Sequence, residues 1–245
     1  MATSRTWELN GRLSRVGGVL GLAWLVLFII GVFVLQGDSP ERDDSIAEIR
    51  RYFIEDGDTY LLGDYLIGIA FMVFFLPFLI ILNRVLSSND NSLPTIASRV
   101  GLFAGALAIL WGGLAGISWG ALAIGAAENP QVDASSVRTL MEIDAYAFAG
   151  LLFPVGLFMG AAGLSIWLSG LLWRWVGAIG IIGFVCCYIG AAWPIDGDDE
   201  GAVAGFGFVG LTVIAVFVLL VSINLLMMKS RGAVAEPAAQ YRADL

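Results

Sequence analysis

Six long apolar runs, separated by short polar segments, dominate the hydrophobic pattern of this chain. Each run has about the 20 residues that an α-helix needs to cross the hydrocarbon core of a bilayer. The runs therefore predict transmembrane helices at 16–35, 61–82, 100–126, 145–168, 175–193 and 203–228. Because no segment between them is long enough for a soluble domain, we expect residues 1–245 to form a single all-α, polytopic membrane helix bundle.

A cationic residue followed by small and branched residues opens every second run. The sequence is Ser14-Arg15-Val16-Gly17 at the first run, Ser98-Arg99-Val100-Gly101 at the third and Arg174-Trp175-Val176-Gly177 at the fifth. We therefore expect three helical hairpins that enter the bilayer from the same side. Asp58-Thr59-Tyr60 and Asp144-Ala145-Tyr146 also occupy matching places, as a parallel duplication of the first two hairpins would give. The preference of Arg and Tyr for membrane boundaries is the alternative explanation.

Two of the polar segments predict short amphipathic helices on the outer surface. Residues 45–48 (S-I-A-E) have the spacing of a capping box, which satisfies free backbone N–H groups at a helix start. Apolar side chains then recur at helical spacing through Phe53. The segment 127–143 predicts a second surface helix of this kind, with Asp133 as its N-cap.

Composition agrees with a membrane protein and also predicts its orientation. The chain is 58% hydrophobic and 14% charged, with a mean hydropathy of +0.84, whereas soluble domains are roughly a quarter charged. The side that holds both termini and the second and fourth loops carries nine of the 13 basic residues but only four of the 21 acidic ones. By the positive-inside rule, both termini are then cytoplasmic and the acidic face is outside.

Several classes of chemistry are disfavoured by what the chain lacks. It has no histidine, which removes His-ligated haem, most zinc sites and the Ser-His-Asp and Cys-His nucleophile systems. Cys186 and Cys187 are adjacent within an apolar run and are expected to be packing residues. No Gly-rich phosphate loop follows a strand, and no basic aromatic surface suggests nucleic acid. We predict no catalytic, cofactor-binding or metal-binding residue.

Asp64 and Asp144 are the ionisable residues that come nearest to the interior of the apolar runs. Ionisable side chains inside membrane helices usually mark an ion path or a proton relay, so the two carboxylates are candidates for binding a cation or a proton at the outer mouth. The structural alternative is that they cap helix starts, where carboxylates suit the helix dipole, with Arg50, Arg51 or Arg138 as partners.

Four isolated polar side chains could line a central cavity: Ser118, Tyr146, Ser165 and Asn224. Single polar groups of this kind also form hydrogen bonds between helices, which is the alternative assignment.

The whole chain resembles a known group of membrane proteins through three motifs: the S-R-V-G start, the outer amphipathic segment DSIAEIRRYF and the L-I-I-L-N-R end of the second run. It resembles small bacterial six-helix integral membrane proteins of unassigned function. The resemblance implies a six-helix fold in the bacterial plasma (inner) membrane and carries over no catalytic or binding residue.

The first functional hypothesis is a non-enzymatic accessory, assembly or interaction subunit. The third run has glycines at four-residue intervals (Gly101 and Gly105; Gly112, Gly116 and Gly120), which allow close approach of helices. The expected partners are the lipid bilayer and another membrane protein or a second copy of the chain. The alternative is a small transporter or channel for a neutral or cationic solute, with an acidic outer mouth that concentrates cations. A cavity reaching the midplane favours this alternative, and a dry centre favours the subunit.

Overall fold

The computed structural model describes residues 2–37, 40, 44–87, 92–196 and 201–228, and the side chains of these except 2–10, 113–118 and 196. This part of the chain is helical and contains no strand. Six of its helices are long and apolar enough to cross a membrane. The prediction of an all-α membrane helix bundle is therefore confirmed, and the chain is a multi-pass integral membrane protein.

The transmembrane helices follow the apolar runs and extend beyond several of them. The first two consist of α1 (Ala2–Ile29) with the π-helical segment η1 (Ile30–Leu35), and of α3 (Gly57–Ile69), the π-helical segment η2 (Ala70–Phe75) and α4 (Leu76–Leu86). The other four are α5 (Leu93–Glu128), α6 (Ala134–Ser169), α7 (Arg174–Gly190) and α9 (Ala202–Met227). Two short helices, α2 (Ile46–Glu55) and α8 (Trp193–Asp196), lie in connecting segments.

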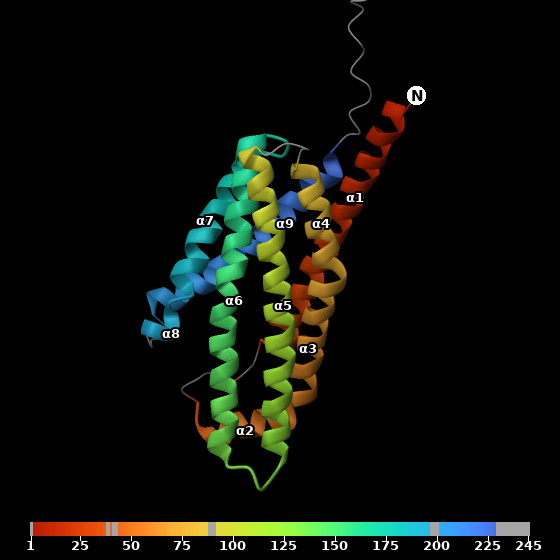
Figure 1. Cartoon of the computed structure of the whole chain (residues 1–245). Coiled ribbons are helices and arrows are strands. Elements are labelled where there is room, and N and C mark those ends of the chain that lie inside the picture. The colour runs from red at the N-terminus through yellow and green to blue at the C-terminus, as the bar shows by residue number, and fades with distance from the viewer. Residues whose placement is uncertain (1, 38–39, 41–43, 88–91, 197–200, 229–245) are drawn as a thin grey trace, which may run out of the picture.

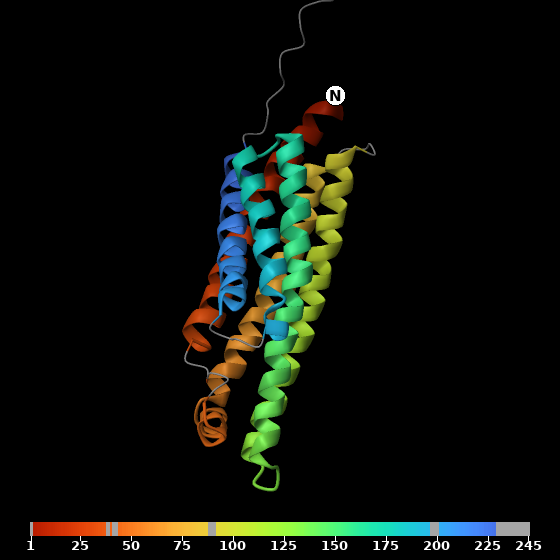
Figure 2. The same cartoon turned by 90° about the vertical axis from the view of Figure 1, so that its left-hand side faces the viewer.

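The six membrane-length helices form a closed ring in the order of the sequence. Each packs on the next, and α9 packs back on α1. The start of α1 and the end of α9 lie at one end of the bundle, while α2 and the turn between α5 and α6 lie at the other (Figures 1 and 2). We call these the terminal end and the α2 end.

The middle of the bundle is filled by aromatic rings. Trp24 on α1 stacks on Phe75 in η2 with ring centroids 4.8 Å apart. Phe75 meets Phe158 on α6 edge to face at 5.5 Å, and Phe158 meets Phe217 on α9 at 6.0 Å. All four side chains are at most 1% exposed. The rings thus form a continuous aromatic layer across the bundle, and offset and edge-to-face pairs of this kind are favourable beyond the area they bury.

The helix α2 lies across the α2 end and holds the ends of α5 and α6 together. Its predicted capping box is confirmed: the Ser45 side chain accepts from the Glu48 backbone, and the Glu48 side chain accepts from the Ser45 backbone. The apolar face of α2, through Ile49 and Phe53, is buried against a small second core on α5 and α6 that includes Val137. The apolar face of α2 therefore packs against α5 and α6.

The second predicted surface helix is not a separate element. Asp133 does form the N-cap, accepting from the Ser135 N–H, but the helix that begins there is α6 itself, which continues for 36 residues. No Gly or Pro occurs between Ala134 and Ala149, so nothing in the local sequence stops the helix before the apolar run begins. After α2, in contrast, the chain changes direction at Asp56 and Gly57.

Candidate functional site

A cavity of about 140 Å³ lies between the first four membrane-length helices, toward the α2 end. Its polar lining is contributed by Gln36, which follows η1, by Tyr60 and Asp64 on α3, and by Asp144 on α6. Four aromatic side chains complete much of the wall: Phe28, Phe71, Trp111 and Phe148. The described residues of the lining include two carboxylates and no Lys or Arg.

Asp64 is the most deeply buried ionisable group of the cavity, with 6% of its surface exposed. Its Oδ1 accepts a hydrogen bond of 2.7 Å from Gln36 Nε2. Its Oδ2 is buried and has no hydrogen-bond partner among the described residues. A Cβ placed on Gly120 of α5 would lie 2.7 Å from that oxygen, so the glycine makes room for the carboxylate. A buried carboxylate with an unpaired oxygen is costly unless something neutralises it.

Tyr60 connects the two acidic residues. Its hydroxyl donates a hydrogen bond of 3.0 Å to Asp144 Oδ2, and its backbone carbonyl accepts a longer bond of 3.4 Å from Gln36 Nε2. The end of the first membrane helix, the start of α3 and the middle of α6 are thereby tied together around the cavity. Asp144 is half-buried, so the second carboxylate also faces a restricted space.

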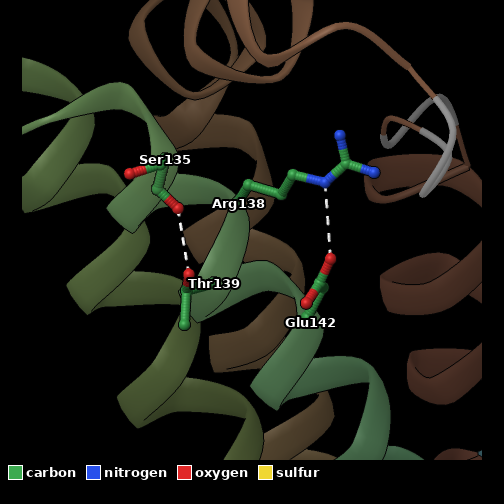
Figure 3. Close-up of polar contacts among 4 residues, drawn as sticks. All are labelled: Ser135, Arg138, Thr139 and Glu142. Atoms are coloured by element: carbon green, nitrogen blue, oxygen red, sulfur yellow. Dashed lines mark hydrogen bonds and ion pairs between the residues drawn. The ribbon is translucent and has the colours of Figure 1, made fainter.

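The positions of the two carboxylates exclude the helix-capping alternative. The caps of α3 and α6 are Asp56 and Asp133, and Asp64 and Asp144 lie at least two turns further inside their helices. Two of the arginines proposed as their partners, Arg50 and Arg138, bind elsewhere. Arg138 forms an ion pair of 3.3 Å with Glu142, beside the bond from Thr139 to the Ser135 carbonyl (Figure 3).

Arg50 is bound to the backbone of the α5–α6 turn. Its Nε donates to the Ala127 carbonyl at 3.0 Å, its Nη1 to that of Val132 at 3.3 Å and its Nη2 to that of Asn129 at 2.9 Å. This Arg50 clasp fixes α2 on the end of the long hairpin. Because α3 begins two residues after α2 ends, the clasp also helps to position Tyr60.

Three of the remaining predicted contacts, Tyr146, Ser165 and Asn224, do not join Asp64 and Asp144. Tyr146 stacks on Trp193 at 5.9 Å and is 41% exposed. Ser165 and Asn224 lie toward the terminal end and form bonds between segments: Ser165 Oγ donates to the Pro94 carbonyl at 2.8 Å, and Asn224 Oδ1 accepts from the Trp173 N–H at 3.2 Å. They match the structural alternative. The side chain of Ser118 lies outside the described residues.

Two π-helical segments flank the cavity. Val32 belongs to η1 and Phe71 to η2, and both line the cavity. For η2 the sequence supplies a cause, because Pro77 has no N–H to donate to the carbonyl of Val73, four residues earlier. π-helical turns are rare and often occur at functional sites. Gln36 could not be predicted as a site residue, because a polar residue directly after an apolar run is typical of a helix end.

The chemistry that this arrangement suits is recognition of a positive charge. The described residues contain no group of three or more His, Cys, Asp or Glu that could hold a metal ion. Carboxylates attract a cation electrostatically, and aromatic faces stabilise it through their quadrupoles.

Comparison with protein-family models, with curated proteins and with solved structures gives no match in any of the three. The resemblance to small bacterial six-helix membrane proteins therefore stays a prediction.

Proposed function

We propose that this integral membrane protein binds a small organic cation in the cavity between Asp64 and Asp144. The observation that carries the proposal is the buried Asp64 carboxylate, whose Oδ2 has no hydrogen-bond partner among the described residues. None of the described residues that line the cavity is basic. A bound cation would supply the missing counter-charge at low dielectric, where the attraction is much stronger than in water. The role is binding and is not enzymatic.

The size and the walls of the cavity favour an organic cation over a hydrated metal ion. An engineered protein cavity of about 150 Å³ takes up one benzene molecule, and this cavity has about 140 Å³. A ligand of about six non-hydrogen atoms therefore fits by that comparison. The rings of Phe28, Phe71 and Trp111 in the lining suit an alkylammonium ion, and each cation–π contact is worth about 0.5–2 kcal/mol.

The cavity supports uptake from one side of the membrane and does not form an open pore. The first membrane span ends at Leu35, and on this helix the cavity lining reaches inward as far as Phe28. The seven residues from Leu35 to Phe28 correspond to about 10 Å along a helix axis. Beyond it, Trp24 and Phe75 belong to the packed aromatic layer. The channel form of the sequence hypothesis therefore has no support in this conformation, whereas binding has.

The cavity is proposed to open toward the outside of a bacterial plasma membrane. Five arginines lie at the terminal end, and no acidic residue does, among the described side chains: Arg12, Arg15, Arg84, Arg99 and Arg174. The described acidic residues lie toward the α2 end. The positive-inside rule then places the terminal end in the cytoplasm and the α2 end outside.

The accessory-subunit hypothesis loses part of one premise, because Gly101 and Gly105 of α5 are used inside the chain. A Cβ on Gly105 would lie 2.5 Å from Leu79 of α4, and one on Gly101 would lie 3.3 Å from the backbone of Ala162 on α6. These glycines allow close packing between neighbours in the ring. A protein partner or a second copy of the chain stays a prediction.

Calorimetric titration with tetramethylammonium tests the proposal, with the protein in maltoside micelles that carry no cation of their own. Asp64→Asn keeps the shape of the side chain and removes its charge. Asp58→Asn is the matched control, since Asp58 is an exposed carboxylate on the same helix. We expect saturable binding to the wild type, a loss of at least about tenfold in Asp64→Asn, equivalent to about 1.4 kcal/mol, and little change in Asp58→Asn. Absence of saturable binding, or equal binding to Asp64→Asn, would overturn the proposal and leave a proton as the counter-charge of Asp64.

A further inference from the structure

A second hollow lies on the lateral surface of the bundle, next to the cavity. It is an open groove of about 1150 Å³ between α5, α6 and α7. Its lining is almost entirely apolar and includes Leu107, Leu110, Phe153 and Tyr188, all of them exposed on the surface of the bundle. In a bilayer, a groove of this kind on a membrane-spanning face is filled by hydrocarbon chains.

The groove and the cavity share one wall. Trp111 and Ala147 line both of them. The indole of Trp111 reaches from α5 to α6, where its Nε1 donates a hydrogen bond of 2.6 Å to the Ala147 carbonyl. It lies so close to Gly150 that a Cβ there would be 2.8 Å from the ring. The side chain is 49% exposed and does not belong to the main buried core among the described residues.

We infer that the ligand is a single-chain amphiphilic cation that enters sideways from the bilayer, with its alkyl chain in the groove and its ammonium head in the cavity beside Asp64 and Asp144. Trp111 then acts as the gate between the two hollows. This inference rests on the proposed function of the cavity and adds the substrate class and the route of entry.

Charge complementarity selects this occupant. Among the side chains that the structure describes, two carboxylates line the cavity, and no Lys or Arg lines either the cavity or the groove. An anionic lipid head would meet like charges without compensation, at low dielectric. A phosphocholine head would bring its phosphate toward the same carboxylates and is larger than a cavity of about 140 Å³ admits. A trimethylammonium head is cationic, apolar on its surface and of the size that fits, and the aromatic rings of the lining can stabilise it.

Chain length is the variable that separates sideways entry from binding of the head alone. A cavity of about 140 Å³ has no space for a long alkyl chain, so decyltrimethylammonium would bind more weakly than tetramethylammonium if the groove played no part. If the chain lies in the groove, decyltrimethylammonium binds at least as tightly, and we expect a gain of tenfold or more. Partition into the micelle lowers the free concentration of the decyl ligand, so the affinities of the two ligands are compared at their free concentrations. The partition is the same for every variant and cancels when variants are compared.

Leu110→Trp fills the groove from an exposed position, and Val209→Trp adds the same ring to an exposed position on α9 as the matched control. The inference is supported if Leu110→Trp abolishes the gain from the decyl chain but keeps tetramethylammonium binding, while Val209→Trp changes neither. Trp111→Phe, which removes the bond to the Ala147 carbonyl, is expected to accelerate association of the decyl ligand.

Two results separate the failures. If tetramethylammonium binds and depends on Asp64, but the decyl ligand binds more weakly or is insensitive to Leu110→Trp, sideways entry is overturned and the cation cavity stands. If neither ligand binds to the wild type in a manner that depends on Asp64, the proposed function is overturned, and this inference with it.

Discussion

Removing the Arg50 clasp is predicted to loosen the α2 end without unfolding the bundle. Arg50 makes three charge-assisted hydrogen bonds to carbonyls of the α5–α6 turn. Such bonds contribute about 1.5–3 kcal/mol each when shielded from water. The bond to Asn129 is exposed, and those to Ala127 and Val132 are partly buried, so water replaces much of what is lost. Arg50→Ala should therefore cost about 2 kcal/mol locally.

The second variant, Arg50→Lys, distinguishes geometry from charge. A lysine keeps the positive charge beside the carbonyls at the end of α5, where the helix dipole favours a cation. Its single ammonium lacks the rigid fork of the guanidinium that reaches three carbonyls at once. We therefore expect Arg50→Lys to recover only a minor part of the loss caused by Arg50→Ala.

Hydrogen–deuterium exchange of the α2 amides is the assay, because it reports local opening separately from global unfolding. A local loss of about 2 kcal/mol corresponds to exchange about 30-fold faster in α2 for Arg50→Ala, with no change in α9. Exchange at the wild-type rate in Arg50→Ala would refute the role of the clasp. Full recovery by Arg50→Lys would show that charge alone is responsible.

Two further predictions concern buried hydroxyls and pH. Ser165 and Ser222 are both fully buried, but Ser165 donates a hydrogen bond to the Pro94 carbonyl, whereas Ser222 Oγ has no partner among the described residues. Ser165→Ala should therefore destabilise the protein by about 1–2 kcal/mol, and Ser222→Ala should be neutral or slightly stabilising. Denaturation in mixed micelles measures both, and equal losses of stability would contradict this prediction. Hydrogen bonds from the side chain and the backbone of Ser45 hold the pKa of Glu48 below its ordinary value of 4.5, so the capping box stabilises α2 above that pH and the stabilisation is lost as the pH falls through the lowered pKa. Exchange in α2 should accelerate in acid, and Ser45→Ala, which removes the side-chain bond and keeps the backbone bond, should reduce this acid-dependent part.

The helices could be predicted from the sequence because apolar length alone determines them in a bilayer. The extension of α6 to Ala134 was missed for the converse reason: a polar, amphipathic segment looks like a surface helix, and only the lack of a Gly or Pro before Ala149 indicates that it continues. The capping box at Ser45 was found because it depends on residues three apart, which are neighbours in any helix.

The cavity could be predicted only in part. Asp64 and Asp144 were recognised because carboxylates near apolar runs are rare, but whether two side chains on α3 and α6 face each other depends on how the helices are rotated in the ring. The hydrogen bond from Tyr60 to Asp144 and the space left by Gly120 decide that rotation. No local periodicity contains this information. Ser165 and Asn224 were chosen as polar groups at depth, and their position toward the terminal end separates them from the cavity.

The most direct measurement is a crystal structure of the wild-type protein grown in a lipidic mesophase with saturating tetramethylammonium. We predict one bound ion in the cavity, in contact with the Asp64 carboxylate and within about 6 Å of the faces of Phe28 and Phe71, the distance at which cation–π attraction acts. An empty cavity at saturating ligand, or an ion bound only at the exposed carboxylates of the α2 end, would contradict it.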